Sequence, residues 1–284
     1  MSKKILLFGA GGMLAHDAVA VLQTGFEVIP SREEELDICS AEAVHAAVSS
    51  IRPEVVINCA AYTLVDACET EREKAFAVNA EGVKHLALAC RQTGSLLVHI
   101  STDYVFDGTK PAAYTETDIP HPLSVYGQSK LAGEQYVQEL LERYVIIRSS
   151  WLYGAGGNNF ISTILRLARD KRELPVVNDQ RGSPTWTRDL SRAMKALLDG
   201  NPQGIYHVSN QGNCTWYEYA RQIVELAGLG LTVRPITTDE LNRPAPRPSY
   251  SVLDCSRFTG ETGMVLRNWE TALEEYIAGA LKEV

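Results

Sequence analysis

The chain has 284 residues, of which 45% are hydrophobic and 22% are charged, a composition typical of a soluble globular protein. Its formal net charge is −8 and its lysines and arginines form no cluster, which argues against nucleic acid and anionic membranes as partners. No apolar run approaches the length of a membrane span, and the N-terminus lacks the apolar region of a signal peptide. The six cysteines form no C-x-x-C pair, so we expect free thiols, no metal site and a cytoplasmic protein.

Short apolar strands alternate with longer helical patterns in the first half of the chain. We expect strands at 4–8, 26–29, 55–58, 96–100 and 144–148, and helices at 13–22, 41–51, 73–93 and 124–142. This alternation predicts an α/β fold, a Rossmann-type doubly wound parallel sheet covered on both faces. From about residue 154 turn residues become frequent, with helices expected at 160–170, 189–198, 216–226 and 269–281. We therefore divide the chain into a Rossmann domain at 1–153 and a smaller C-terminal lobe at 154–284, some segments of which return to the sheet.

Glycines lie directly between the first expected strand and the first expected helix, in the run Gly9-Ala10-Gly11-Gly12. Glycine lets the backbone turn tightly and approach a pyrophosphate, which then lies at the N-terminus of the helix. The pattern is G-x-x-G-x-x-A, and a turn needed only for packing is the alternative interpretation. The order strand, glycines, helix favours a bound dinucleotide.

The end of the second strand bears on the choice of dinucleotide. It carries Arg32 and lacks the acidic residue that commonly binds the ribose 2′-hydroxyl of NAD. Arg32 is suited to a 2′-phosphate, which indicates NADPH as the cofactor. NADH remains the alternative, because three glutamates follow at once and a solvated loop arginine explains Arg32 equally well.

Tyr126 and Lys130 are spaced four residues apart, which on a helix places them on one face. A positive charge beside a phenol favours the phenolate and so lowers the pKa of the tyrosine, which suits proton transfer to or from a substrate oxygen. Taken alone, the pattern is more often a half-buried tyrosine beside a solvated lysine. The neighbouring motifs decide between the two interpretations.

Four motifs are informative together: S-T-D-Y-V-F at 101–106, Y-G-Q-S-K at 126–130, N-N-F at 158–160 and D-Q-R-G-S-P-T at 179–185. The first two resemble the extended short-chain dehydrogenase/reductase superfamily. The last two narrow the resemblance to the dTDP-4-dehydrorhamnose reductase family, and it extends over nearly the whole chain.

The resemblance implies a set of site residues by position. Thr102, Tyr126 and Lys130 match the catalytic triad, with Tyr126 as the general acid and Lys130 as the residue that binds the nicotinamide ribose and lowers the tyrosine pKa. Besides Tyr126, Lys130 and Arg32, the expected cofactor contacts are Gly9, Gly12, Met13, Leu14, Asp37, Ile38, Ala61, Tyr62 and Thr63. The expected substrate contacts are Thr102, Asp103, Trp151, Asn159 and Arg247.

The family's activity would be the reduction of dTDP-4-dehydro-6-deoxy-L-mannose to dTDP-L-rhamnose, with cofactor in the N-terminal domain and sugar nucleotide in the C-terminal lobe. A dehydratase is disfavoured, because Tyr104 stands where elimination would need a glutamate after Thr102 and Asp103. Another sugar-nucleotide reductase, a 4-epimerase and a non-catalytic dinucleotide-binding regulatory subunit remain as alternatives. The sequence leaves open whether the chain forms a homodimer.

Overall fold

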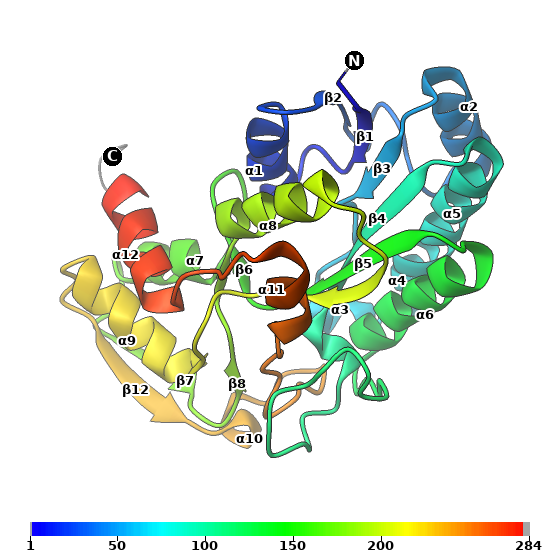
Figure 1. The fold of residues 1–284 in the computed structure, drawn as a ribbon. Helices are drawn as coiled ribbons and strands as arrows, with labels where there is room; N and C mark the ends of the chain where they lie inside the picture. Colours follow the sequence, from blue (N-terminus) through cyan, green and yellow to red (C-terminus); the bar gives the residue numbers. More distant parts are fainter. Residues whose placement is uncertain (1, 281–284) are drawn as a thin grey trace.

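The computed structural model describes residues 2–280, and a six-stranded parallel sheet forms its centre (Figure 1). The strands follow the order β10-β5-β4-β3-β1-β2, so the direction of winding reverses between β1 and β3. Their bounds are β1 (Lys4–Phe8), β2 (Glu27–Ser31), β3 (Val55–Asn58), β4 (Leu96–Thr102), β5 (Tyr144–Ser149) and β10 (Gly204–His207). The predicted doubly wound fold is confirmed, and ligands in such sheets bind at the carboxyl ends of the strands beside the reversal.

Helices cover both faces of the sheet, which explains why its strands are almost continuously apolar. On one face pack α1 (Met13–Leu22), α8 (Thr187–Asp199) and α11 (Ser256–Thr262). On the other pack α2 (Ala41–Ile51), α5 (Gly82–Thr93) and α6 (Val125–Leu140). Ser40 and Ser124 cap the N-termini of α2 and α6 with their side chains, as the helix-start pattern requires.

The helix expected at 73–93 is continuous but not uniform. It consists of α4 (Arg72–Phe76), a π-helical turn (Ala77–Glu81) and α5. Within the π turn the buried Asn79 side chain accepts from the Tyr62 backbone nitrogen at 2.8 Å and donates to the Tyr62 carbonyl at 3.0 Å. The widened turn thus holds the loop that follows β3 at the edge of the sheet.

Segments beyond residue 153 contribute to the sheet, because β10 pairs with β5 and α8 packs against α1. The remaining C-terminal elements surround a separate apolar core on the side of α1 and α8 (Figure 1). The elements not yet given bounds are α3 (Val65–Cys68), a 3-10 turn (Asp103–Val105), β6 (Leu152–Tyr153), α7 (Phe160–Leu167), β7 (Glu173–Val177), β8 (Arg181–Gly182), β9 (Thr185–Trp186), β11 (Cys214–Thr215), α9 (Trp216–Leu226), β12 (Thr232–Ile236), α10 (Thr238–Leu241) and α12 (Trp269–Ala280). The last residue of the helix expected at 269–281 lies outside the described residues. No helix within residues 2–280 combines the length and apolar character needed to cross a membrane.

A fully buried ion pair ties α6 to the sheet. The Arg148 guanidinium on β5 donates to both carboxylate oxygens of Glu134 on α6, with its closest contact at 2.6 Å. The Ser101 hydroxyl on β4 donates to the same carboxylate at 2.5 Å. Both charged side chains are at most 2% exposed, so each compensates for the hydration that the other loses on burial.

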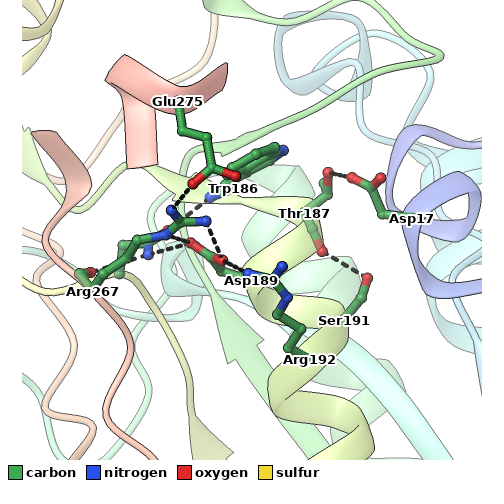
Figure 2. A network of polar contacts seen from close by, with 9 residues as sticks. Asp17, Trp186, Thr187, Asp189, Ser191, Arg192, Arg267 and Glu275 are labelled. Carbon is green, nitrogen blue, oxygen red and sulfur yellow. Dashed lines mark hydrogen bonds and ion pairs between the residues drawn. The ribbon is translucent and has the colours of Figure 1, made fainter. Parts of the chain in front are cut away.

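A second polar network joins the first turn of α8 to the C-terminal segments (Figure 2). Arg267 donates to the two Asp189 oxygens at 2.8 Å each, and it also pairs with Glu275 on α12. Asn210 donates to Asp189 at 2.9 Å. At the other end of the network, the Thr187 hydroxyl donates to Asp17 on α1. The network therefore connects two of the helices on one sheet face, α1 and α8, with α12, the last helix of the lobe.

Asp189→Asn should destabilise the protein, because it leaves the Arg267 guanidinium without its bidentate partner. We expect the free energy of unfolding to fall by about 2–3 kcal/mol, as for a largely buried ion pair that loses one member. Asp199→Asn is the control, since it removes an exposed pair with Lys195 on the same helix and should cost less than about 1 kcal/mol. Urea unfolding measures both, and equal losses would contradict the role of the network.

Candidate active site

A cavity of about 500 Å³ lies at the carboxyl edge of the sheet, beside the point where the winding reverses. Residues from the β1–α1 turn, the ends of β3 and β4, the first turns of α6 and the segment after β5 surround it. Its lining includes Gly11, Gly12, Met13, Leu14, Cys59, Ala61, Thr63, Thr102, Asp103, Tyr104, Tyr126, Lys130, Trp151, Asn158 and Trp216. The cavity therefore brings together residues that are more than a hundred positions apart in the sequence.

The turn between β1 and α1 has the shape that a pyrophosphate requires. Gly9 has φ +80°, and a Cβ there would lie 2.6 Å from the Ala60 nitrogen, so only glycine fits. The Gly12 nitrogen donates to the Gly9 carbonyl at 2.9 Å and closes the turn. No side chain caps the N-terminus of α1, so the first helical N–H groups, those of Met13 and Leu14, have capacity for an anion, and both residues line the cavity.

The three residues predicted to be catalytic line this cavity together. Because α6 begins directly after Ser124, Tyr126 lies in its first turn and Lys130 one turn further along. Thr102 is the last residue of β4. The Lys130 ammonium is 2% exposed and donates to the Ile100 carbonyl at 2.7 Å, and its burial lowers its pKa to about 8.

The pKa of Tyr126 departs from our expectation. Desolvation raises it above its ordinary value, and the charge of Asp103 adds to the rise, whereas the interaction with the Thr102 side chain lowers it. The prediction that Lys130 lowers the pKa of Tyr126 is therefore wrong. In this structure the Tyr126 side chain is a neutral phenol at neutral pH.

Thr102 and Asp103 are joined to each other and to the local backbone. The Thr102 hydroxyl donates to Asp103 Oδ1 at 3.0 Å and accepts from the Tyr104 nitrogen at 3.1 Å, so it also caps the following 3-10 turn. Asp103 is 2% exposed, and its Oδ2 has no hydrogen-bond partner within residues 2–280. Burial raises the pKa of this carboxyl to about 7, so it changes charge near neutral pH.

The other predicted cofactor residues divide into two groups. Ala61 and Thr63 line the cavity, whereas Tyr62 donates through its hydroxyl to Glu71 at 3.0 Å on the outside of the loop. The cavity does not include Arg32, Asp37 and Ile38. Arg32 is exposed at the end of β2, Asp37 accepts from the Cys39 nitrogen, and Ile38 is buried in the core beside α5.

Trp151 stands against a second indole that the sequence did not single out. Its ring stacks on Trp216 with centroids 3.6 Å apart, and a Cβ at Gly182 would lie 2.6 Å from its Cε2 atom. Trp151 has φ +47°, an uncommon conformation for a bulky residue, so the surroundings hold its backbone in place. The helix expected at 216–226 begins at Trp216 in the structure, but the sequence did not show which cavity this residue faces.

A second cavity of about 340 Å³ adjoins the first, since Tyr104 and Trp216 line both. Its walls are mainly apolar side chains of α7 and β7, with Arg243 and Arg247 at one end. Both arginines donate to the Asp66 carboxylate, at 3.0 Å and 2.9 Å. The structure thus combines a positively charged end with an apolar wall next to the predicted catalytic residues.

Asn159 was expected to contact the substrate, but in the structure it caps a helix. Its side chain accepts from the Ser162 nitrogen at 3.0 Å, which caps α7, and it donates to the Gly154 carbonyl at 2.9 Å. It lines neither cavity, whereas its neighbour Asn158 lines the first. The N-N-F motif therefore supplies one asparagine to the cavity and one to the helix start.

The chain is similar to a protein family and to solved structures over nearly its whole length. The family model of the RmlD substrate binding domain matches residues 3–281. A dTDP-4-dehydrorhamnose reductase of Streptomyces griseus is 46% identical over 95% of this chain and 91% of its own. The spore coat polysaccharide biosynthesis protein SpsK of Bacillus subtilis (strain 168) is 44% identical over 96% of each chain. The crystal structure of dTDP-4-dehydrorhamnose reductase from Bacillus anthracis str. Ames in complex with NADP is 40% identical, with a TM-score of 0.95 over 98% of this chain and 100% of that chain.

Asp103→Asn should change how stability depends on pH. A carboxyl whose pKa is raised in the folded state destabilises that state progressively as pH rises through the interval between the unfolded and folded pKa values, here 3.8 and about 7. We therefore expect the variant to gain about 2–3 kcal/mol relative to the natural chain on going from about pH 5 to about pH 8. Urea unfolding at both pH values measures this. Asp170→Asn, at an exposed position, is the control, and a gain that is equal at both pH values would contradict the prediction.

Proposed function

This chain belongs to the family of the RmlD substrate binding domain, the dTDP-4-dehydrorhamnose reductases, and on that premise we propose that it reduces dTDP-4-dehydro-6-deoxy-L-mannose to dTDP-L-rhamnose with NADPH. The single observation that carries the proposal is the cavity in which the uncapped α1 N-terminus, Thr102, Tyr126 and Lys130 meet. A reductase of this kind needs a dinucleotide and a proton donor in the same space.

The residues around the first cavity fit a dinucleotide. The N–H groups of Met13 and Leu14 would hold the pyrophosphate, where the partial positive charge of the helix end favours it. Lys130 would hold the nicotinamide ribose hydroxyls, because its ammonium is fixed at the cavity wall. Arg32 is exposed and forms no ion pair within residues 2–280, so its guanidinium is available for a 2′-phosphate. This supports NADPH, with NADH as the alternative.

The bound cofactor supplies the hydride that converts the C4 carbonyl into an alcohol. Tyr126 donates the proton that the developing C4 oxygen requires, and its raised pKa keeps it protonated at neutral pH until that oxygen becomes strongly basic. Thr102 stands beside Tyr126 at the strand end, where its hydroxyl orients the same oxygen. The buried Lys130 keeps the ribose end of the cavity positively charged while it is protonated.

The second cavity suits the nucleotide part of the substrate. Arg243 and Arg247 lie at its end and would bind the diphosphate, with Arg247 the less exposed of the two. The apolar wall would receive the base. Trp151 and Trp216 line the first cavity together with Thr102, Tyr126 and Lys130, Trp216 also lines the second, and the two indole rings would hold the sugar.

The proposed activity is tested with the ketosugar nucleotide and either NADPH or NADH, by following absorbance of the reduced nicotinamide. The natural chain should oxidise NADPH in proportion to the rhamnose nucleotide formed. Arg32→Ala should raise KM for NADPH by about 10-fold, because it removes a charge-assisted contact, and should leave KM for NADH almost unchanged. Arg91→Ala, an exposed arginine on α5, is the control. No oxidation of either cofactor would contradict the reductase, and tightly retained NAD with interconversion of sugar epimers would identify an epimerase.

Tyr126→Phe should lower kcat by about 10²–10⁴-fold, the usual contribution of a positioned general acid, while the Kd for NADPH stays within about 2-fold. The physical reason is that phenylalanine keeps the ring in place and removes only the proton donor. Stopped-flow turnover and fluorescence titration with NADPH measure the two quantities. Tyr217→Phe on α9, away from both cavities, should change neither. A Tyr126→Phe variant with nearly full kcat would show that another group donates the proton.

A further inference from the structure

Three buried polar side chains contact one another in a row that leads from strand β3 through strand β4 to helix α6. It begins at Asn58, the last residue of β3, continues to His99 on β4 and ends at Lys130 on α6. Asn58 and His99 are neighbours in the strand register. The Asn58 Nδ2–His99 Nδ1 distance is 3.1 Å and the His99 Nε2–Lys130 Nζ distance is 3.5 Å. None of the three side chains is more than 2% exposed, so water does not compete for these contacts.

The backbone fixes the orientation of the Asn58 amide. The Ala60 nitrogen donates to Asn58 Oδ1 at 3.0 Å, which leaves Nδ2 as the atom that faces the histidine. An amide Nδ2 can only donate, so His99 Nδ1 must accept. A neutral imidazole with an accepting Nδ1 carries its proton on Nε2. Burial and the nearby Lys130 charge lower the pKa of His99 well below its ordinary value, so the ring stays neutral.

This tautomer presents an N–H group to the Lys130 nitrogen. An ammonium has three donors and no acceptor, so it gains nothing from a facing N–H, whereas an amine can accept through its lone pair. The other titratable groups that face Lys130 are few. Glu134 and the Cys59 thiol raise its pKa, but burial outweighs them, and the Glu134 carboxylate is already bound by Arg148 and Ser101. The histidine N–H therefore acts in the same direction as burial.

We propose that Asn58 and His99 are positioning residues for Lys130: the Asn58 amide fixes the His99 tautomer, and the His99 N–H directed at Lys130 favours the neutral amine over the ammonium. This inference deepens the proposed function, on which its catalytic consequence rests. The protonated form supplies positive charge at the ribose end of the cavity, and the neutral form removes it. The charge next to Tyr126 is then set by strands β3 and β4 as well as by helix α6, which carries Tyr126 and Lys130.

The tautomer is the direct test, and it needs neither cofactor nor substrate. Heteronuclear NMR of histidine-labelled natural protein should show the His99 proton on Nε2. Asn58→Asp keeps an acceptor for the Ala60 nitrogen but offers the histidine an acceptor in place of a donor. It should therefore move the proton to Nδ1. A natural protein with the proton on Nδ1, or a variant that leaves it on Nε2, would overturn the proposal.

The effect on Lys130 is measured by NMR titration of the lysine ε-methylene groups. The natural chain should show one lysine that titrates near pH 8, far below the surface lysines. In His99→Gln the side chain can turn its carbonyl oxygen toward the ammonium, so the Lys130 pKa should rise by about one unit or more. His45→Gln on the exposed face of α2 is the control. An unchanged Lys130 pKa in His99→Gln would overturn the role of the histidine.

The pH profile connects this result to catalysis. In His99→Gln, the limb of the kcat profile that reports Lys130 should move by the same amount as the pKa measured by NMR. A merely structural role for His99 would lower kcat without moving that limb, and this outcome would contradict the proposal. Absence of turnover in the natural chain as well as in the variants would instead contradict the reductase function and leave both NMR results valid.

Discussion

Helix α6 carries two residues of the predicted catalytic triad, and its position depends on the buried ion pair between Glu134 and Arg148. The pair joins α6 to β5, and Ser101 on β4 donates to the same carboxylate. Arg148 also lies 3.4 Å from His207 on β10. Because an unpaired charge at this depth would cost several kcal/mol, α6 has one favourable position relative to three neighbouring strands. The distance from Tyr126 to the strand end at Thr102 follows from that position.

The same low-dielectric region determines the chemistry of the site. Burial raises the pKa of Asp103 and of Tyr126 and lowers that of Lys130, so each group shifts toward its neutral form. A proton donor that is neutral until the substrate oxygen becomes basic is suited to a reduction. The polar partners around these groups, such as His99 beneath Lys130, act on an environment in which small differences of hydrogen bonding have large effects.

Much of the framework could be predicted from the sequence. The strand and helix bounds at 4–8, 13–22, 41–51 and 55–58 agree with the structure residue for residue, because short apolar strands and periodic helices are local patterns. The glycine turn and the spacing of Tyr126 and Lys130 predicted residues that do line one cavity. Asn159 and Trp216 could not be assigned in the same way. Whether an asparagine caps a helix or faces a ligand, and which cavity an indole enters, depends on elements distant in the chain.

By itself, the sequence determined the order of the elements, the glycine turn and the family to which the chain belongs, and it predicted the residues of the triad, because these follow from local spacing and motif. The tertiary structure alone decided the electrostatics: that Tyr126 has a raised pKa, that Asp103 titrates near neutrality and that His99 directs an N–H at Lys130. A pKa depends on burial and on neighbours from other strands, and neither is written in the residues beside the group. The sequence already predicted that Tyr126 and Lys130 lie on one face of a helix. Only the tertiary structure shows which groups surround each of them.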